Sequence, residues 1–322
     1  MNLVIENLSK TYPNGTQALK NVSLEIPTGM FGLLGPNGAG KSSLMRTIST
    51  LQDADTGSIK LGDIDVLKEK AQVRQVLGYL PQEFGVYPRM SAYQMLDHFA
   101  LLKGIKNSRE RKEIVKALLH QTNLYQQRNI KLSNYSGGMK QRFGIAQALL
   151  GNPKLIIVDE PTAGLDPAER NRFHNLLSEI GENIIVILST HIVEDVSNLC
   201  RNMAIIHKGE VLLTGNPRQQ IEAAKGKVWK KIIDKEALQD HQANFNVVSS
   251  HMFDGQIIIK VFGDTRPNES FEASEPDLED VYFAHIKTKE QGEQQSDTEP
   301  NQGSQLVDAG NVSQNPEENK TV

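Results

Sequence analysis

A glycine-rich segment, GPNGAGKSS at Gly35–Ser43, constrains this 322-residue chain more than any other feature. It follows a short apolar run at Phe31–Leu34 and leads into a helical pattern at Ser42–Ser49. Glycines let a backbone wrap closely with its N–H groups turned inward, and the helix that follows directs its positive end to the same place. Lys41 is suited to neutralise β- and γ-phosphates, and the Ser42 hydroxyl is suited to bind Mg²⁺. The segment therefore predicts a strand–loop–helix unit that binds a triphosphate.

A second motif is an apolar run at Leu155–Val158 that ends in Asp159, Glu160 and Pro161. The run predicts a buried strand, and open α/β sheets bind their ligands at the carboxyl ends of such strands. Asp159 suits the coordination shell of Mg²⁺, and Glu160 suits a base that orients or deprotonates an attacking water. An apolar run followed by acids is as often without function, but its place downstream of a phosphate loop favours triphosphate hydrolysis.

A third motif, Ser136-Gly137-Gly138, precedes a helical pattern at Met139–Leu150. A serine and two glycines at a helix start can form a second anion site. The alternative is a plain helix cap, which the three residues alone would favour. Their position shortly before the acidic strand favours the anion site.

Composition excludes several classes of protein. The formal net charge of −4 is carried by residues 287–322, so the rest of the chain is balanced and broad electrostatic binding to nucleic acid is not expected. We expect no membrane span, because the longest aliphatic stretch, Ile184–Leu188, is far below the roughly 20 residues that a span needs. The N-terminus shows no secretion signal, and the single cysteine, Cys200, fits a reducing compartment.

Short apolar strands alternate with helical patterns, which predicts an α/β fold with a mostly parallel sheet. The expected strands are Leu3–Tyr12, Ala18–Ile26, Phe31–Leu34, Val73–Leu80, Leu155–Val158, Ile184–Ser189, Met203–His207 and Glu210–Thr214. The expected helices are Ser42–Ser49, Ala92–Lys103, Arg109–Asn123 and Met139–Leu150. The Asn14-Gly15 turn between the first two strands predicts an N-terminal antiparallel β subdomain.

These patterns divide the chain into regions. Residues 1–220 are expected to form a nucleotide-binding domain, with a helical subdomain inserted at about 87–150. Residues 221–286 are expected to form a small C-terminal α+β appendage, with strands at Val228–Ile233, Asn246–His251 and Gln256–Phe262 and a helix at Lys235–Gln242. Residues 287–322 are polar and acidic and are expected to be disordered, because they cannot bury enough apolar surface.

Together the three motifs resemble those of the nucleotide-binding subunit of ABC (ATP-binding cassette) transporters over about residues 3–220. The resemblance implies a P-loop NTPase cassette that hydrolyses ATP with Mg²⁺. It also implies that two cassettes, here two identical subunits, pack head to tail around two ATP. Each ATP would lie between the phosphate loop of one subunit and the Ser-Gly-Gly segment of the other. A separate transmembrane permease would hold the pair on the inner face of the cell membrane.

The resemblance also assigns residues. Phosphate and Mg²⁺ binding falls to Gly35, Pro36, Asn37, Gly38, Ala39, Gly40, Lys41, Ser42 and Ser43. Gln82 and Asp159 would join Ser42 around Mg²⁺, and Gln82 would also couple to the permease. Glu160, His191 and Lys41 would be catalytic, and Tyr12 would stack on adenine. Ser136, Gly137 and Gly138 would contact the γ-phosphate across the dimer, and Asp166 would link the two sites.

Two features refine the resemblance. The family's commonest signature is Leu-Ser-Gly-Gly-Gln, whereas Tyr135 and Met139 flank Ser-Gly-Gly here; we expect the site to survive this change. Pro276–Phe283 is similar to the "SLEDVF" element of ABC-2-type exporter ATPases, although it also fits a capped helix with an acidic first turn. The exporter interpretation is favoured over the capped helix.

Two other functions stay open at this stage. The chain could be a soluble ABC-type ATPase in nucleic-acid repair, translation or cofactor assembly. Against this, no sustained heptads lie between Lys41 and Ser136, as the coiled coil of a repair ATPase would require, and the chain holds one cassette. It could also be a nucleotide sensor without activity, but intact Glu160 and His191 favour an enzyme.

Overall fold

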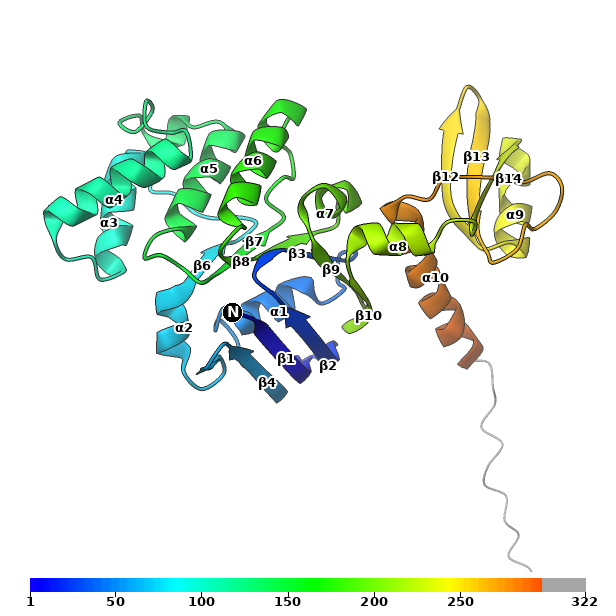
Figure 1. Ribbon diagram of the computed structural model, residues 1–322, viewed down its shortest axis with the longest axis horizontal. Helices are drawn as coiled ribbons and strands as arrows, with labels where there is room; N and C mark the ends of the chain where they lie inside the picture. The colour runs from blue at the N-terminus through cyan, green and yellow to red at the C-terminus, as the bar shows by residue number, and fades with distance from the viewer. Residues whose placement is uncertain (297–322) are drawn as a thin grey trace, which may run out of the picture. The chain divides into compact units, whose positions relative to one another are not determined.

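The computed structural model describes residues 1–296 (Figure 1). Residues Met1–Lys287 form one compact unit. The predicted disorder of residues 287–322 is wrong for its first part, because helix α10 (Leu278–Ser296) continues through residue 296. Charged and amide side chains at Lys289–Gln291 do not prevent a helix from continuing once its first turns are packed. Residues 297–322 lie outside the described part of the chain.

A six-stranded sheet in the order β10-β9-β3-β8-β7-β6 forms the centre of the fold (Figure 1). Its strands are β3 (Gly29–Leu34), β6 (Leu77–Leu80), β7 (Leu155–Asp159), β8 (Ile185–Thr190), β9 (Asn202–His207) and β10 (Glu210–Gly215). All neighbours pair in parallel except β9 and β10, so the predicted mostly parallel sheet is confirmed. The central strands are largely apolar, as expected for strands that are covered on both faces.

Successive residues of these strands pack into two different cores, as the period of two requires. Leu155 and Ile157 of β7 join a core with α1 (Lys41–Ile48) and an antiparallel sheet. Ile156 and Val158 join a second core. That core is covered by helices α6 (Pro167–Ile180) and α7 (Val193–Leu199), with the region after α8 (Pro217–Ala223) adding to its edge.

The antiparallel sheet has the order β2-β1-β4-β5, and it confirms the predicted N-terminal β subdomain. Its strands are β1 (Leu3–Thr11), β2 (Gln17–Ile26), β4 (Thr56–Leu61) and β5 (Ile64–Asp65). The sequence did not predict β4, whose second residue, Gly57, is a poor strand former. Gly57 is needed there because a Cβ would lie 2.6 Å from the carbonyl oxygen of Asn7, in the neighbouring strand β1.

The predicted strand Val73–Leu80 is half wrong. Residues Lys70–Val76 form helix α2, and only Leu77–Leu80 form strand β6. Val73, Val76, Leu77 and Leu80 are spaced as on one face of a helix as well as in a buried strand, so the pattern alone was ambiguous.

Helices form the inserted region between β6 and β7. They are α3 (Ala92–Leu102), α4 (Ser108–Gln121) and α5 (Gly137–Ala148), with a short 3₁₀ turn at Leu132–Asn134. Helix α5 is buried on two sides: Phe143 and Ala146 pack among the other helices, whereas Ile145 and Ala148 pack on the central sheet. This helix therefore connects the inserted helices to the sheet.

The C-terminal region holds a third sheet in the order β12-β13-β11-β14. Its elements are β11 (Val228–Ile233), η2 (Lys235–Ala237), α9 (Leu238–Asn244), β12 (Val247–Phe253), β13 (Gln256–Phe262), β14 (Glu272–Ala273) and α10. Residues of α10 such as Leu278 and Val281 belong to the same buried cluster as α6 and α7. Within residues 1–296, no helix combines the length and apolar character that crossing a bilayer requires.

Candidate active site

The phosphate loop runs from the end of β3 to the first residue of α1, and its glycines are needed for different reasons. Gly38 and Gly40 have φ of +79° and +108°, which side chains with a Cβ rarely adopt. At Gly35 the limit is space, because a Cβ there would lie 2.3 Å from the carbonyl oxygen of Ile206. A hydrogen bond of 2.8 Å from the N–H of Gly209 to the carbonyl of Ala39 ties the loop to the β9–β10 turn.

Lys41 lies inside this loop rather than in solvent. Its Nζ donates to the carbonyl oxygens of Gly35 at 2.6 Å and Pro36 at 3.1 Å. It also lies 3.7 Å from Oε1 of Glu160. Burial lowers the pKa of Lys41, while the carboxylates of Glu160 and Asp159 act in the opposite direction. The amine is thus placed where negative phosphate charge would be neutralised.

Asp159 and Glu160 follow each other at the carboxyl end of β7, and both are buried. Glu160 has φ of +48°, a strained conformation for a residue with a Cβ. Its N–H donates to the carbonyl of Ser189 in β8 at 2.9 Å, and this bond helps to hold the turn in place. Burial raises the pKa of the Asp159 carboxyl, and the charge of Glu160 raises it further. Strain of this kind is common where a side chain must be aimed at a reacting group.

His191 completes the group from the end of β8. Its Nδ1 lies 2.6 Å from Oε2 of Glu160, and its side chain is half exposed. On either side of it in the chain, the Thr190 hydroxyl accepts a hydrogen bond of 2.9 Å from the N–H of Ile192. Glu160 therefore lies between a lysine at one carboxylate oxygen and a histidine at the other.

One cavity of about 650 Å³ joins most of the predicted residues, and this volume is within the usual range for ligand pockets. Its predicted members are Tyr12, Pro36, Asn37, Gly38, Ala39, Gly40, Lys41, Ser42, Ser43, Gln82, Glu160 and His191. No sequence motif pointed to Thr16, Gln17, Ala18, Lys20 and Lys208, which come from the β1–β2 turn, strand β2 and the β9–β10 turn. None of these five residues belongs to a nucleotide-binding motif, so only the tertiary structure brings them to the cavity.

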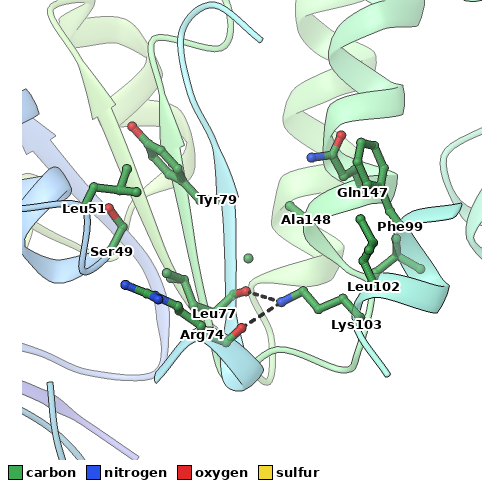
Figure 2. Close-up of a pocket in the computed structure, with 12 residues that line it drawn as sticks. Ser49, Leu51, Arg74, Leu77, Tyr79, Phe99, Leu102, Lys103, Gln147 and Ala148 are labelled. Carbon is green, nitrogen blue, oxygen red and sulfur yellow. Dashed lines mark hydrogen bonds between the residues drawn. The ribbon is translucent and has the colours of Figure 1, made fainter. Parts of the chain in front are cut away.

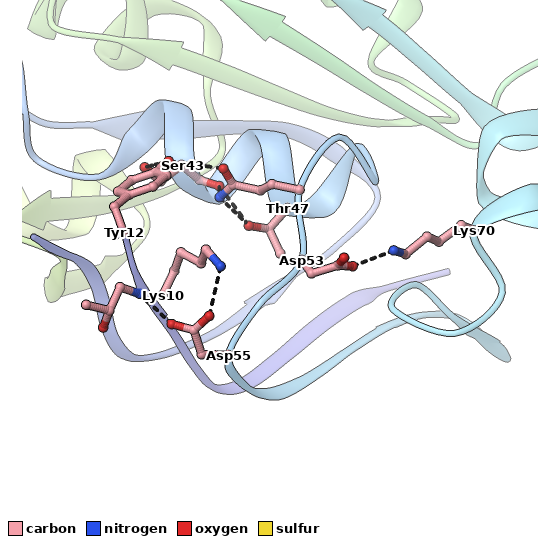
Figure 3. A network of polar contacts seen from close by, with 9 residues as sticks. Lys10, Tyr12, Ser43, Thr47, Asp53, Asp55 and Lys70 are labelled. Carbon is pink, nitrogen blue, oxygen red and sulfur yellow. Dashed lines mark hydrogen bonds and ion pairs between the residues drawn. The ribbon is translucent and has the colours of Figure 1, made fainter. Parts of the chain in front are cut away.

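Tyr12 is fixed by its hydroxyl, as Figure 3 shows. The oxygen lies 3.0 Å from Ser43 Oγ and 3.0 Å from Gln52 Oε1. The Gln52 amide also donates to the Ser43 carbonyl and to Thr47 Oγ1, at 2.9 Å each. The aromatic ring that lines the cavity is therefore attached to the helix that follows the phosphate loop. No sequence motif pointed to Gln52.

Neighbouring ion pairs hold the chain around this network. Lys10 Nζ lies 2.8 Å from Asp55, whose other oxygen accepts from the N–H of Thr11 at 2.6 Å (Figure 3). Lys70 pairs with Asp53 at the far end of the same loop.

The remaining predicted residues do not line the cavity. Ser136 Oγ caps α5 by accepting from the N–H of Met139 at 3.2 Å. Asp166 caps α6 by accepting from the N–H of Glu169 at 2.8 Å. Within one chain, both residues therefore act as helix caps, and the N-terminus of α5 is separate from the phosphate loop.

Oxygen atoms dominate the groups that could hold a divalent cation. The Ser42 hydroxyl and the Gln82 amide are exposed and line the cavity, whereas Asp159 is the buried last residue of β7 and is not a lining residue. Within the described residues no cluster of three or more His, Cys, Asp or Glu side chains could hold a metal by itself. A few hard oxygen ligands that leave room for phosphate oxygens and water fit Mg²⁺.

Comparison with known proteins decides the family. Residues 19–163 match the ABC transporter family. The linearmycin resistance ATP-binding protein LnrL of Bacillus subtilis is 37% identical over 215 residues, which are 66% of this chain and 68% of LnrL. This chain belongs to the ABC transporter ATP-binding family. The ABC transporter ATP-binding protein NatA of the same organism is 37% identical over 202 residues, which are 62% of this chain and 82% of NatA.

Solved structures of ABC cassettes have the same fold. The ATP-binding cassette MJ0796, in a dimeric post-hydrolysis state with ADP and phosphate, superposes with a TM-score of 0.61 at 28% identity. The match covers 66% of this chain and 98% of MJ0796. The predicted P-loop NTPase cassette is therefore confirmed, and this ABC ATPase binds and hydrolyses ATP.

Proposed function

We propose that this ABC ATPase is the subunit of an ABC-2-type export transporter that hydrolyses ATP on Mg²⁺. Two identical copies close around two ATP and drive a separate permease at the inner face of the cell membrane. Nucleic acid is not a partner.

The proposal of a dimer depends on one observation. Lys41, Glu160 and His191 meet in one cavity, but Ser136–Gly138 and Asp166 do not line it. The capped N-terminus of α5 can bind phosphate only if a second copy presents it to the cavity. A dimeric state of the related cassette MJ0796 with ADP and phosphate supports this arrangement.

The residues of the cavity then have separate roles. The phosphate loop and Lys41 hold the β- and γ-phosphates, and Tyr12 stacks on the adenine. Glu160 orients the attacking water and accepts its proton, while His191 contacts the γ-phosphate as charge develops. Ser42, Gln82 and Asp159 would hold Mg²⁺, which neutralises phosphate charge when it is bound.

The names of two relatives and the segment Pro276–Phe283 support a role in export. One relative is named for linearmycin resistance, and another, YbhF of Escherichia coli, is named a probable multidrug ATP-binding protein. The segment Pro276–Phe283 includes the start of α10, where Asp277 and Asp280 each accept a hydrogen bond from the other's N–H, at 2.9 and 3.1 Å. The capped helix is therefore observed, and the exporter interpretation of this segment stays a proposal.

A second groove, lined in part by Leu77, Gly78 and Tyr79 of β6, suits the permease (Figure 2). It has a volume of about 430 Å³ and lies between the α2–β6 region and helices α3 and α5. Leu51 and Leu102 on its walls are 63% and 69% exposed, so the groove presents apolar side chains to solvent. Lys103 fixes the floor by donating to the carbonyls of Arg74 and Leu77 at 3.0 and 2.9 Å.

The variant Glu160→Gln tests the function. It keeps the shape of the side chain but cannot accept a proton, so hydrolysis should fall by about 10²- to 10⁴-fold. ATP should then hold the variant as a stable dimer, measured by analytical ultracentrifugation with and without ATP. Hydrolysis at the wild-type rate would refute the role of Glu160, and a monomer with ATP bound would refute the shared site.

A further inference from the structure

Asp195 is a completely buried carboxylate that none of the roles above uses. It lies in the first turn of α7 and is 0% exposed. One oxygen, Oδ2, accepts from the Thr162 hydroxyl at 2.6 Å. The other, Oδ1, accepts from Arg170 Nε at 2.8 Å and lies 2.9 Å from His174 Nε2. Both oxygens are thus fully engaged by three side chains.

These partners come from the segments that carry the site. Thr162 follows Glu160 and Pro161 in the chain, at the end of β7. Arg170 and His174 lie on α6, the helix that Asp166 caps. Asp195 itself is on α7, which begins at Val193, just after His191. One carboxylate therefore joins the loops of Glu160, Asp166 and His191.

The negative charge of Asp195 holds this junction, the contacts of its carboxylate with Thr162, Arg170 and His174, in place. A buried carboxylate is costly unless it is paired and hydrogen-bonded, so moving any one partner away would leave charge unpaired. Burial would raise the pKa of Asp195, but hydrogen bonds from His174, Thr162 and Arg170 outweigh it and lower the pKa below its usual value. Asp195 is accordingly ionised at neutral pH, and its three partners stay attached.

We propose that Asp195, through Thr162, is a positioning residue for ATP hydrolysis: it fixes the Glu160 loop relative to the His191 loop. Glu160 and His191 are in contact at 2.6 Å, so a small displacement of either loop separates them. The inference rests on the proposed catalytic roles of these two residues. It adds that the distance between Glu160 and His191 is fixed by Asp195, a buried residue that does not contact ATP.

A matched pair of substitutions at Thr162 tests the inference. Thr162→Val keeps the volume and removes the hydroxyl, whereas Thr162→Ser keeps the hydroxyl. Because a misplacement of about 1 Å costs about 10²-fold, we expect the valine variant to lower kcat by about 10- to 100-fold. We expect the serine variant to stay within about threefold of wild type in kcat. KM for ATP should not change in either, since the phosphate loop is untouched.

A second pair separates the effect from general loss of stability. Asp195→Asn should lower kcat by at least as much as Thr162→Val. Glu194→Gln is its control, because Glu194 is 69% exposed and contacts the same Arg170 but not Thr162. Thermal unfolding of every variant gives the folded fraction, to which kcat is normalised. If Asp195→Asn does not fold, the Thr162 pair decides.

The outcomes are distinct. A kcat for Thr162→Val equal to that of Thr162→Ser would overturn the inference, as would a rise in KM that accounts for the whole loss of kcat/KM. In the Glu160→Gln background, Thr162→Val should add no further loss, because the base is already absent; an additional tenfold loss would mean that Thr162 acts elsewhere. Wild-type hydrolysis by Glu160→Gln alone would instead refute the proposed function and not the junction.

Discussion

Nδ1 of His191 lies 2.6 Å from Oε2 of Glu160, although the two residues follow different strands of the central sheet. β7 and β8 are parallel neighbours paired in register from Leu155 with Ile185 to Asp159 with Ser189. Residues beyond their carboxyl ends therefore lie side by side. The contact is a consequence of strand register, and it places an imidazole at the edge of the phosphate cavity.

His191→Ala should lower kcat for ATP by about 10²-fold, because it removes the group proposed to stabilise charge as it develops on the γ-phosphate. The dissociation constant for ATP should change by no more than about threefold, since Lys41 and the phosphate loop remain. Steady-state hydrolysis and equilibrium binding measure the two quantities. A loss of binding with kcat preserved would place His191 in ground-state recognition only.

Tyr12→Phe and Tyr12→Ala separate the hydroxyl of Tyr12 from its ring. The phenylalanine keeps the ring but loses the bonds to Ser43 and Gln52, so the KM for ATP should rise by about 2- to 10-fold. The alanine also loses the proposed stacking on adenine, so KM should rise by at least tenfold. Affinity for inorganic triphosphate, which lacks a base, is the control and should stay unchanged in both variants. An equal loss for triphosphate would mean that Tyr12 supports the phosphate loop instead of adenine.

Leu102→Asp should weaken attachment to the permease without changing basal hydrolysis. Leu102 lines the groove in Figure 2, whereas its neighbour Leu101 is 47% exposed and is not a lining residue. Leu101→Asp is therefore the matched control. The fraction of protein that sediments with membranes from the producing cells should fall only for Leu102→Asp. Equal membrane recovery of both variants would argue against this groove as the docking site.

Lys260→Met should destabilise the C-terminal region by about 3 kcal/mol, because it leaves a buried carboxylate without its partner. Lys260 Nζ lies 2.8 Å from Asp280, whose side chain is 1% exposed, and 2.9 Å from Asp277. Lys230→Met is the control, since Lys230 faces Lys260 across β11 and β13 but makes only a 3.8 Å pair on the surface. Chemical denaturation of the two variants should differ clearly, and equal free energies of unfolding would contradict the buried pair.

Asp277→Asn should change how stability depends on pH. Although burial opposes it, hydrogen bonds from the N–H of Asp280 and from Lys260 lower the pKa of Asp277. A carboxyl with a lowered folded pKa contributes stability above its unfolded pKa of about 3.9 and loses it as pH falls through the folded value. Asparagine keeps the helix cap, so the difference in melting temperature from wild type should shrink between pH 6 and pH 3. A constant difference would show that Asp277 contributes no charge-dependent stability.

Local patterns in the sequence determined the phosphate loop, the buried strand with its two acids and the α/β class. These features could be predicted because each depends on residues that are neighbours in the chain. The phosphate loop depends on the conformations of Gly38 and Gly40, and the buried strand depends on an apolar run that ends at Asp159. Patterns failed where one spacing fits two structures, as at Val73–Val76. They also failed where a tertiary contact requires an unusual residue, as at Gly57.

Only the tertiary structure decided which distant side chains meet. Gln52 holds Tyr12, and Asp195 joins Thr162 to α6, through contacts between residues that no local period relates. The fold also decided that Ser136 does not line the cavity of its own chain, and its expected contact with a γ-phosphate across a dimer stays a prediction. The physical reason is that sequence fixes local conformation and burial, while strand order and register decide which ends of the elements come together.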